Sequence, residues 1–116
     1  MRCFAWPLAV ACLVLLAGCG KTVGDTCANN TACGAGLICD LSVPEGYCTR
    51  SPCRKGECPA ESVCVDFGAE ASWCMRRCDQ NQGCRAGISC LDSAAEGVSA
   101  TCLDDVETCA FCGVAP

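Results

Sequence analysis

Residues 27–48 read CANNTACGAGLICDLSVPEGYC, with cysteines at positions 27, 33, 39 and 48. Two similar groups follow, and the first cysteines of the three groups lie 26 and 25 residues apart. Five residues always separate the second cysteine from the third, and the second of those five is alanine. The later groups are Cys53, Cys58, Cys64 and Cys74, then Cys78, Cys84, Cys90 and Cys102. A fixed period of this kind predicts tandem modules of one structural type.

Each module contains short apolar segments bounded by turn residues. An aspartate follows every third cysteine closely, and glycine-containing turn sequences lead to the fourth cysteine in the first and third groups. No segment after residue 20 has sustained helical periodicity. We therefore expect a small disulfide-rich fold of short β-hairpins and loops in tandem four-cysteine modules, with little helix.

Composition makes covalent cross-links necessary. After residue 18 the aromatic residues are Tyr47, Phe67, Trp73 and Phe111, so a chain of this length can bury little apolar core. Tyr47 and Trp73 each precede a fourth cysteine, where an aromatic ring can pack over a disulfide or serve as a binding anchor. We expect the packing role.

The amino-terminal segment has the pattern of an export signal. Arg2 supplies one positive charge, and residues 3–16 contain no charged residue but are too few to span a bilayer. The run ends in Leu16-Ala17-Gly18-Cys19, which resembles the lipobox of bacterial lipoproteins. That resemblance implies loss of residues 1–18, a diacylglyceryl group on the thiol of Cys19, and acylation, such as palmitate, of its new amino group. The alternative is an ordinary secreted protein in which Cys19 forms a disulfide.

The cysteine count agrees with the lipobox. Of 17 cysteines, Cys3 and Cys12 would leave with the signal and Cys19 would carry lipid, so fourteen remain for seven disulfides. An exported chain reaches an oxidising compartment in which disulfides persist. Residue 20 is glycine and not aspartate, which resembles lipoproteins sorted to the outer membrane of Gram-negative bacteria. The face of that membrane is not indicated.

These patterns predict six segments. They are a lipoprotein signal peptide (1–18), a lipidated tether (19–26), three cysteine-rich modules (27–52, 53–77 and 78–108) and a Cys-x-x-Cys tail (109–116).

The module pattern Cys27-x5-Cys33-Gly-Ala-Gly-x2-Cys39-x8-Cys48 resembles half-modules of the colipase-like family, which includes the amino-terminal region of Dickkopf proteins. It is also similar to cysteine-rich repeats of myxobacterial lipoproteins. Sequence alone allows three connectivities for four cysteines. The family resemblance implies that the first cysteine pairs with the third and the second with the fourth. The implied bridges are Cys27–Cys39, Cys33–Cys48, Cys53–Cys64, Cys58–Cys74, Cys78–Cys90 and Cys84–Cys102. Each would stabilise the fold by about 3 kcal/mol in the chain-entropy model.

Cys109 and Cys112 form the one Cys-x-x-Cys of the chain. Acidic neighbours would raise a thiol pKa there, which disfavours thiol exchange. We expect a structural bridge, either Cys109–Cys112 or one to a truncated fourth module. The nearby Asp104, Asp105 and Glu107 lack EF-hand spacing and are interpreted as solvated acids.

Catalysis and metal binding are not expected, and no cofactor is implied. The chain has no histidine, which excludes Ser-His-Asp and Cys-His arrangements, and a second zinc knuckle is missing. Loss of Arg2 with the signal would leave seven basic and thirteen acidic residues, a net charge of −6 without the basic stripe that nucleic acid requires. The paired bases Arg54-Lys55 and Arg76-Arg77 are interpreted as solvated loop charges.

The sequence therefore predicts a non-catalytic envelope lipoprotein. It would be held to the membrane by lipid on Cys19 and would display loops 41–47, 65–73 and 91–101 to a protein or cell-surface partner. A secreted toxin-like or ligand-like effector without lipid is the second hypothesis, and an envelope redox or metal-buffering protein is the third.

Overall fold

The computed structural model describes residues 20–80, 83–104 and 108–116. Within these ranges the chain forms a small disulfide-rich structure of short antiparallel strands and loops, and its helical segments are the single 3-10 turns η1 (Asn30–Ala32) and η2 (Gly68–Glu70). The strands are β1 (Ile38–Cys39), β2 (Cys48–Thr49), β3 (Ser62–Asp66), β4 (Ser72–Arg76), β5 (Ser89–Asp92), β6 (Thr101–Cys102) and β7 (Ala110–Gly113). The predicted fold class is confirmed.

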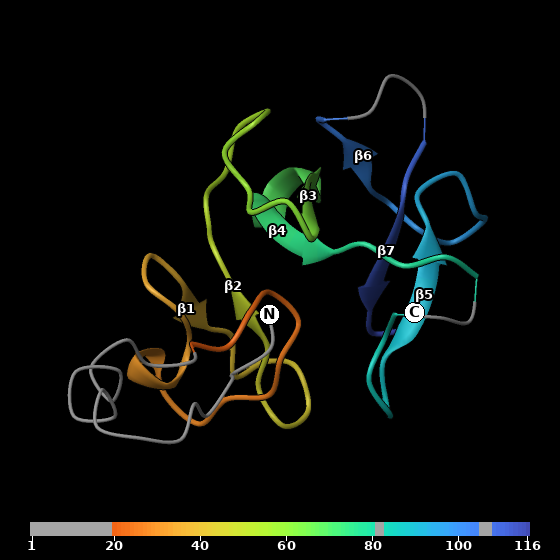
Figure 1. The fold of residues 1–116 in the computed structure, drawn as a ribbon. Coiled ribbons are helices and arrows are strands. Elements are labelled where there is room, and N and C mark those ends of the chain that lie inside the picture. The colour runs from red at the N-terminus through yellow and green to blue at the C-terminus, as the bar shows by residue number, and fades with distance from the viewer. Residues whose placement is uncertain (1–19, 81–82, 105–107) are drawn as a thin grey trace, which may run out of the picture.

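The first two modules are antiparallel hairpins with the same register. Strand β1 pairs with β2 so that Cys39 lies opposite Cys48, and β3 pairs with β4 so that Cys64 lies opposite Cys74. The first hairpin lies at the lower left of Figure 1 and the second near its centre. In both, therefore, the third and fourth cysteines of the module face each other across the strands.

A turn between the second and third cysteines recurs in all three modules. The N–H donors of Leu37, Ser62 and Ile88 bond the carbonyl three residues earlier, at 3.0, 2.9 and 3.2 Å. Gly36 and Gly87 occupy the third turn position with φ of 79° and 84°, which a type II turn requires. The constant five-residue spacing thus encodes a four-residue turn in every module, and its third position has a positive φ in modules one and three.

The aspartate after each third cysteine also has one repeated role. The carboxylate of Asp40 accepts the N–H of Ser42 at 2.9 Å, and Asp66 and Asp92 accept the N–H groups of Gly68 and Ala94 at 2.8 Å. Each aspartate thereby initiates the loop that leaves its strand.

Seven disulfides connect the cysteines from Cys27 to Cys112. Five coincide with the pairs that the family resemblance implied, with Cα atoms 5.5–6.0 Å apart: Cys27–Cys39, Cys33–Cys48, Cys53–Cys64, Cys58–Cys74 and Cys78–Cys90. The other two are Cys84–Cys112 and Cys102–Cys109. The expected pairs Cys84–Cys102 and Cys109–Cys112 are therefore wrong.

Strand pairing explains both corrections. In the third module β5 pairs with β7, which places Cys112 opposite Cys90, the position that a fourth cysteine takes in the other modules. Strand β6 instead joins the second module, in a sheet of order β4-β3-β6. Cys102 is thus carried away from Cys84 and bonds Cys109. The segment 109–116 is the closing strand of module three and not a separate tail.

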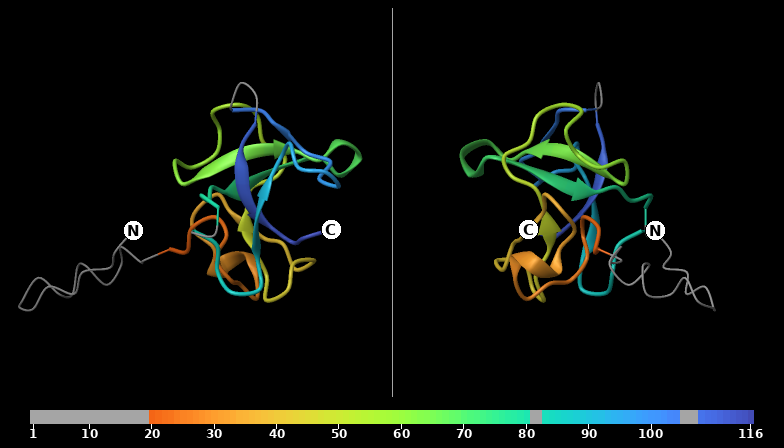
Figure 2. Two further views of the ribbon diagram at one scale, coloured as in Figure 1. Left: turned by 90° about the vertical axis from the view of Figure 1, so that its right-hand side faces the viewer. Right: turned by 60° about the vertical axis from the view of Figure 1, so that its left-hand side comes forward.

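The three modules share one core. Phe111 of β7 is buried and makes an edge-to-face contact with Phe67, with ring centroids 5.7 Å apart. Strand β7 also contacts the second hairpin through an antiparallel bridge between Arg77 and Phe111, and the views in Figure 2 place it against the central strands. The main buried cluster combines Val23, Tyr47, Cys53, Val63, Cys64, Val65, Cys74, Met75, Cys102, Cys109 and Phe111.

Residues 20–26 are part of the folded domain rather than a tether. Val23 is completely buried, and the N–H of Gly24 and the carbonyl of Asp25 each bond the backbone of Cys48 at 2.9 Å. Lys21 forms a parallel bridge with Cys33. The expected tether 19–26 is corrected from residue 20 onward, while Cys19 and the signal peptide lie outside the described residues.

Candidate functional site

A partly buried polar junction joins the three modules around Arg85. Its guanidinium donates to the carbonyl oxygens of Gly24, Pro44 and Gly46 at 2.6–2.7 Å, and its Cζ lies 5.7 Å from the ring centre of Tyr47. A side chain of module three thus holds residues 20–26 and loop 41–47 of module one together. The Nε atom of Arg85 is buried without a hydrogen-bond partner among the described residues.

Tyr47 completes the junction. Its hydroxyl donates to the carbonyl of Cys112 at 2.8 Å and accepts the N–H of Arg76 at 3.0 Å, so one oxygen connects all three modules. Burial raises the pKa of Tyr47 to about 12, against the opposing effects of the Arg76 N–H and the charges of Arg85 and Arg76. The expected packing role is confirmed, and a ring that is 1% exposed cannot anchor a partner.

The sequence carries a signal for the closing cysteine of module three that cysteine spacing does not reveal. Phe111 precedes Cys112 as Tyr47 precedes Cys48 and Trp73 precedes Cys74. Trp73 is partly buried, and its indole N–H donates to the carbonyl of Glu70 at 2.8 Å. An aromatic residue followed by cysteine therefore marks the closing strand of every module.

The predicted display loops are exposed mainly at their tips. In loop 41–47, Leu41 is 67% exposed, whereas Tyr47 is in the core. In loop 65–73, η2 is exposed, whereas Val65 is completely buried. In loop 91–101, Val98 and Ala100 pack against the core.

Two predicted surface charges have structural contacts. Arg76 donates to the carbonyl of Gly83 at 3.0 Å and to the hydroxyl of Thr22 at 3.2 Å, so it is not a solvated loop charge. Asp104 accepts the N–H groups of Gly56 and Cys64, both at 2.7 Å, so it is not a solvated acid. Both residues connect different modules. Asp105 and Glu107 lie outside the described residues, while Arg54 and Lys55 are exposed as expected.

Three groups of cysteine sulfurs lie within 4.8 Å of one another: Cys27, Cys33 and Cys39; Cys53, Cys58 and Cys64; Cys78, Cys84 and Cys112. Every member of these groups is in a disulfide. Disulfide sulfur lacks the thiolate charge that binds a metal. These groups are therefore stacked cross-links, and a metal would need prior reduction of the protein.

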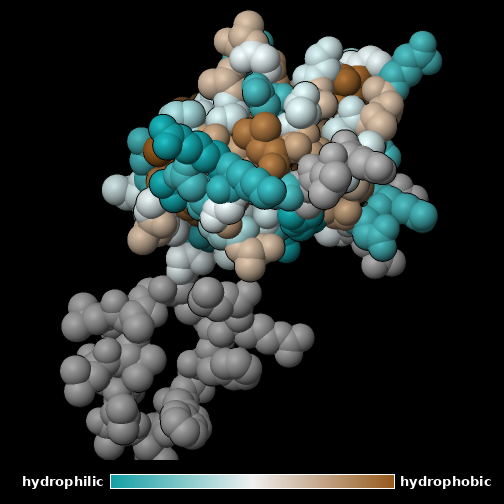
Figure 3. Space-filling view, turned by 90° about the horizontal axis from the view of Figure 1, so that it is seen from above, coloured by the Kyte–Doolittle hydropathy of each residue, from teal (hydrophilic) through white to brown (hydrophobic). Residues whose placement is uncertain are grey.

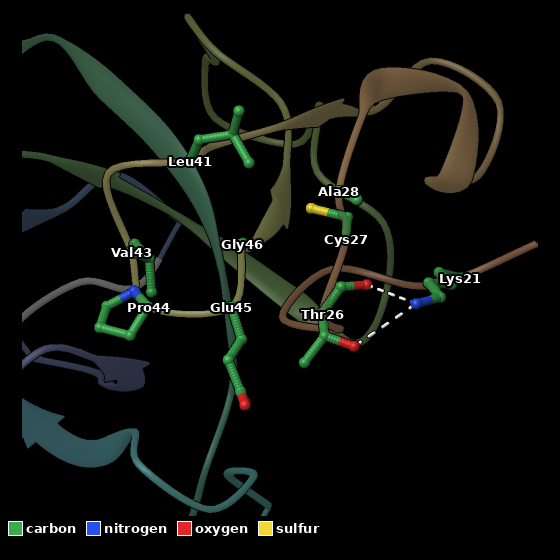
Figure 4. A pocket seen from close by; sticks show the side chains of 9 residues that line it. All are labelled: Lys21, Thr26, Cys27, Ala28, Leu41, Val43, Pro44, Glu45 and Gly46. Atoms are coloured by element: carbon green, nitrogen blue, oxygen red, sulfur yellow. Dashed lines mark hydrogen bonds between the residues drawn. The ribbon is translucent and has the colours of Figure 1, made fainter.

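Beside the start of the described chain, module one has an open hollow of about 690 Å³. Leu41 and Val43 project along one side of it, and Lys21 lies across from them, bonded to Thr26 (Figure 4). Its lining is about equally polar and apolar and consists of Lys21, Thr26, Cys27, Ala28, Leu41, Val43, Pro44, Glu45 and Gly46.

Elsewhere, hydrophobic residues on the face drawn in Figure 3 form small patches among hydrophilic ones. Across residues 20–80, 83–104 and 108–116, the large hydrophobic side chains that are well exposed are Ile38, Leu41 and Val114. In the same part of the chain no helix has the length and apolarity to cross a membrane.

Comparison with protein-family models, curated proteins and solved structures finds no match to this chain.

Proposed function

We propose that this protein is a non-catalytic lipoprotein of the outer membrane of a Gram-negative bacterium, anchored through lipid on Cys19. The folded domain serves as a disulfide-stapled binding or structural module for a protein or cell-surface partner. Its exposed loop tips are the surface available to that partner.

The disulfide pattern is the observation that carries the proposal. The seven bridges use all fourteen cysteines from Cys27 to Cys112. None of these cysteines remains to pair with Cys19, which is the residue that the lipobox resemblance assigns to lipid. Several acyl chains on one residue hold a protein durably at a membrane, whereas a single chain holds it only marginally.

The domain is suited to binding rather than catalysis. The buried Tyr47 and the partly buried Arg85 and Asp104 use their polar groups in hydrogen bonds between modules. A rigid frame lowers the ordering cost of loop contacts, which favours recognition by the exposed tips.

The test is the intact mass of the protein purified from a bacterial membrane fraction, before and after reduction and alkylation. We expect a chain that begins at Cys19, carries lipid and has fourteen thiols only after reduction. The Cys19→Ser variant is the matched control and should keep its amino-terminal segment without lipid.

Two outcomes would favour the competing hypotheses. An unlipidated chain in the soluble fraction, with all disulfides formed, would contradict anchoring and indicate a secreted effector. Thiols that react before reduction would indicate a redox or metal-buffering protein.

A further inference from the structure

We propose that module one lies directly on the bilayer, with the hollow beside Lys21 and the exposed Leu41 facing the lipid surface. This inference rests on the lipid anchor at Cys19. It adds an orientation: one defined face of the protein contacts lipid, and the second and third modules extend away from it.

From Gly20 onward the chain packs directly against module one, without a free linker. A Cβ on Gly20 would lie 3.1 Å from Cα of Gly34, and a Cβ on Gly34 would lie 2.6 Å from the carbonyl oxygen of Lys21. The Gly34 N–H also donates to that oxygen at 3.1 Å. The chain is thus packed on module one from the residue immediately after Cys19.

A second feature is the chemistry of the adjacent surface. Lys21 lines the hollow together with Leu41, Val43 and Pro44, so the anchored end of the chain and these apolar side chains border one cavity (Figure 4). Of the three large hydrophobic residues that are well exposed in the described part of the chain, Ile38 and Leu41 belong to this module. An exposed apolar side chain such as Leu41 can insert into the interfacial region of a membrane, and the charges of Lys21 and Glu45, which also line the hollow, balance each other.

A third feature is charge. Residues 20–52 contain two basic and three acidic residues, residues 53–77 contain four of each, and residues 78–116 contain one basic and six acidic residues. Anionic lipids would therefore repel the third module much more strongly than the first two. Of these two, module one also has the attachment point, so contact through module one keeps the most acidic module away from the bilayer.

The experiment places a tryptophan probe either in module one or near the carboxyl end of the chain, after β7. Trp73 would be the single tryptophan after removal of residues 1–18, so the background is Trp73→Phe. Into it are introduced Leu41→Trp or, as the matched control, Val114→Trp, since Val114 is also an exposed apolar residue at 52%. Each lipidated variant is reconstituted in phosphatidylethanolamine–phosphatidylglycerol vesicles with brominated acyl chains.

We expect severalfold stronger bromine quenching for Leu41→Trp than for Val114→Trp, because an interfacial side chain inserts about 5–10 Å into the headgroup and acyl boundary. Inserting about ten Gly and Ser residues between Cys19 and Gly20 adds an average reach of about 17 Å. Quenching of the Leu41→Trp variant should then fall toward the control value. Fourteen thiols, seen only after reduction, verify the fold of each variant.

The possible failures are distinguishable. Lipidated protein with equal quenching at both probes would overturn the orientation and leave the anchor intact. If quenching at Leu41→Trp persists with the inserted tether, direct attachment to the lipidated Cys19 does not set the orientation of module one, which contradicts this part of the proposal. Absence of lipid in the intact mass would overturn both the anchor and the orientation.

Discussion

Gly46 occupies a site that has no room for the Cβ atom of any other residue. It has φ of 76°, and a Cβ on it would collide with the carbonyl group of Cys27 and lie 2.9 Å from the Cys27 sulfur. Its own carbonyl oxygen accepts a hydrogen bond from the guanidinium of Arg85. A single glycine therefore controls how the loop of module one meets both a disulfide and the junction between modules.

Gly46→Ala should lower the free energy of unfolding by about 3 kcal/mol or more, from steric overlap and left-handed backbone strain together. Gly56→Ala is the matched control, because Gly56 has φ of 81° with open space around it. The control should lose only about 1–2 kcal/mol. Equal losses in denaturant unfolding would contradict the contact with Cys27.

Tyr47 should make the domain sensitive to alkali. Its folded pKa of about 12 lies above the ordinary value of 10, so the folded state favours the neutral phenol. The stabilisation is complete below pH 10 and is lost as pH rises from 10 toward 12, by about 3 kcal/mol in total.

Unfolding free energies measured below and within this pH range test the effect. Tyr47→Phe should lose about 1–3 kcal/mol at neutral pH, because Arg76 N–H and the Cys112 carbonyl lose their partner. The variant should lack the Tyr47 contribution to the alkaline decline. Since the chain has one tyrosine, phenolate absorbance reports its ionisation directly.

Strand β7 is the element on which the third module depends. It places Cys112 opposite Cys90 and Phe111 in the shared core. Its bridge Cys84–Cys112 spans 28 residues, compared with seven for Cys102–Cys109. Closing a longer loop removes more entropy from the unfolded chain.

We expect removal of Cys84–Cys112 by double serine substitution to cost about 3–4 kcal/mol, and removal of Cys102–Cys109 to cost about 2 kcal/mol, in the chain-entropy model. Mass spectrometry of peptides from unreduced protein should link Cys84 to Cys112. A peptide that links Cys84 to Cys102 would contradict the pairing of β5 with β7.

Local structure was predictable from sequence, and exchange between modules was not. Each of the five bridges that match the expected pairs joins two cysteines of the same repeat, where constant spacing and a similar turn bring them together. Pairing of β6 with β3 is a contact across modules, and no period along the chain encodes it. The hydrogen bonds that Arg85 and Asp104 make to other modules were not predictable either, because an isolated charge in a loop gives no sign of the carbonyl or N–H groups that will face it.

At the scale of the whole molecule, the modules are connected into one folded unit. Arg85, Tyr47 and Asp104 each connect different modules, and residues from all three contribute to the main core. We expect one unfolding transition rather than three, with fluorescence and circular dichroism changing together.

Arg85→Met should lower the free energy of unfolding by about 2–3 kcal/mol, because three carbonyl oxygens lose a charged donor. Arg85→Lys should recover part of the loss, since an ammonium group cannot reproduce the planar guanidinium fork. Arg54→Met, at an exposed arginine, should remain within about 0.5 kcal/mol. A loss at Arg85 no larger than at Arg54 would contradict the junction.

The late position of the closing cysteine affects maturation. A chain that emerges amino end first presents Cys102 to the waiting Cys84 thiol before Cys112 arrives, and the bridge Cys84–Cys102 would imitate the earlier repeats. The native pairing then requires thiol–disulfide exchange, which is slow without a catalyst. The yield of this protein should therefore depend on a disulfide isomerase in the compartment where it is oxidised. That enzyme would convert a premature Cys84–Cys102 bridge into the native Cys84–Cys112 bridge.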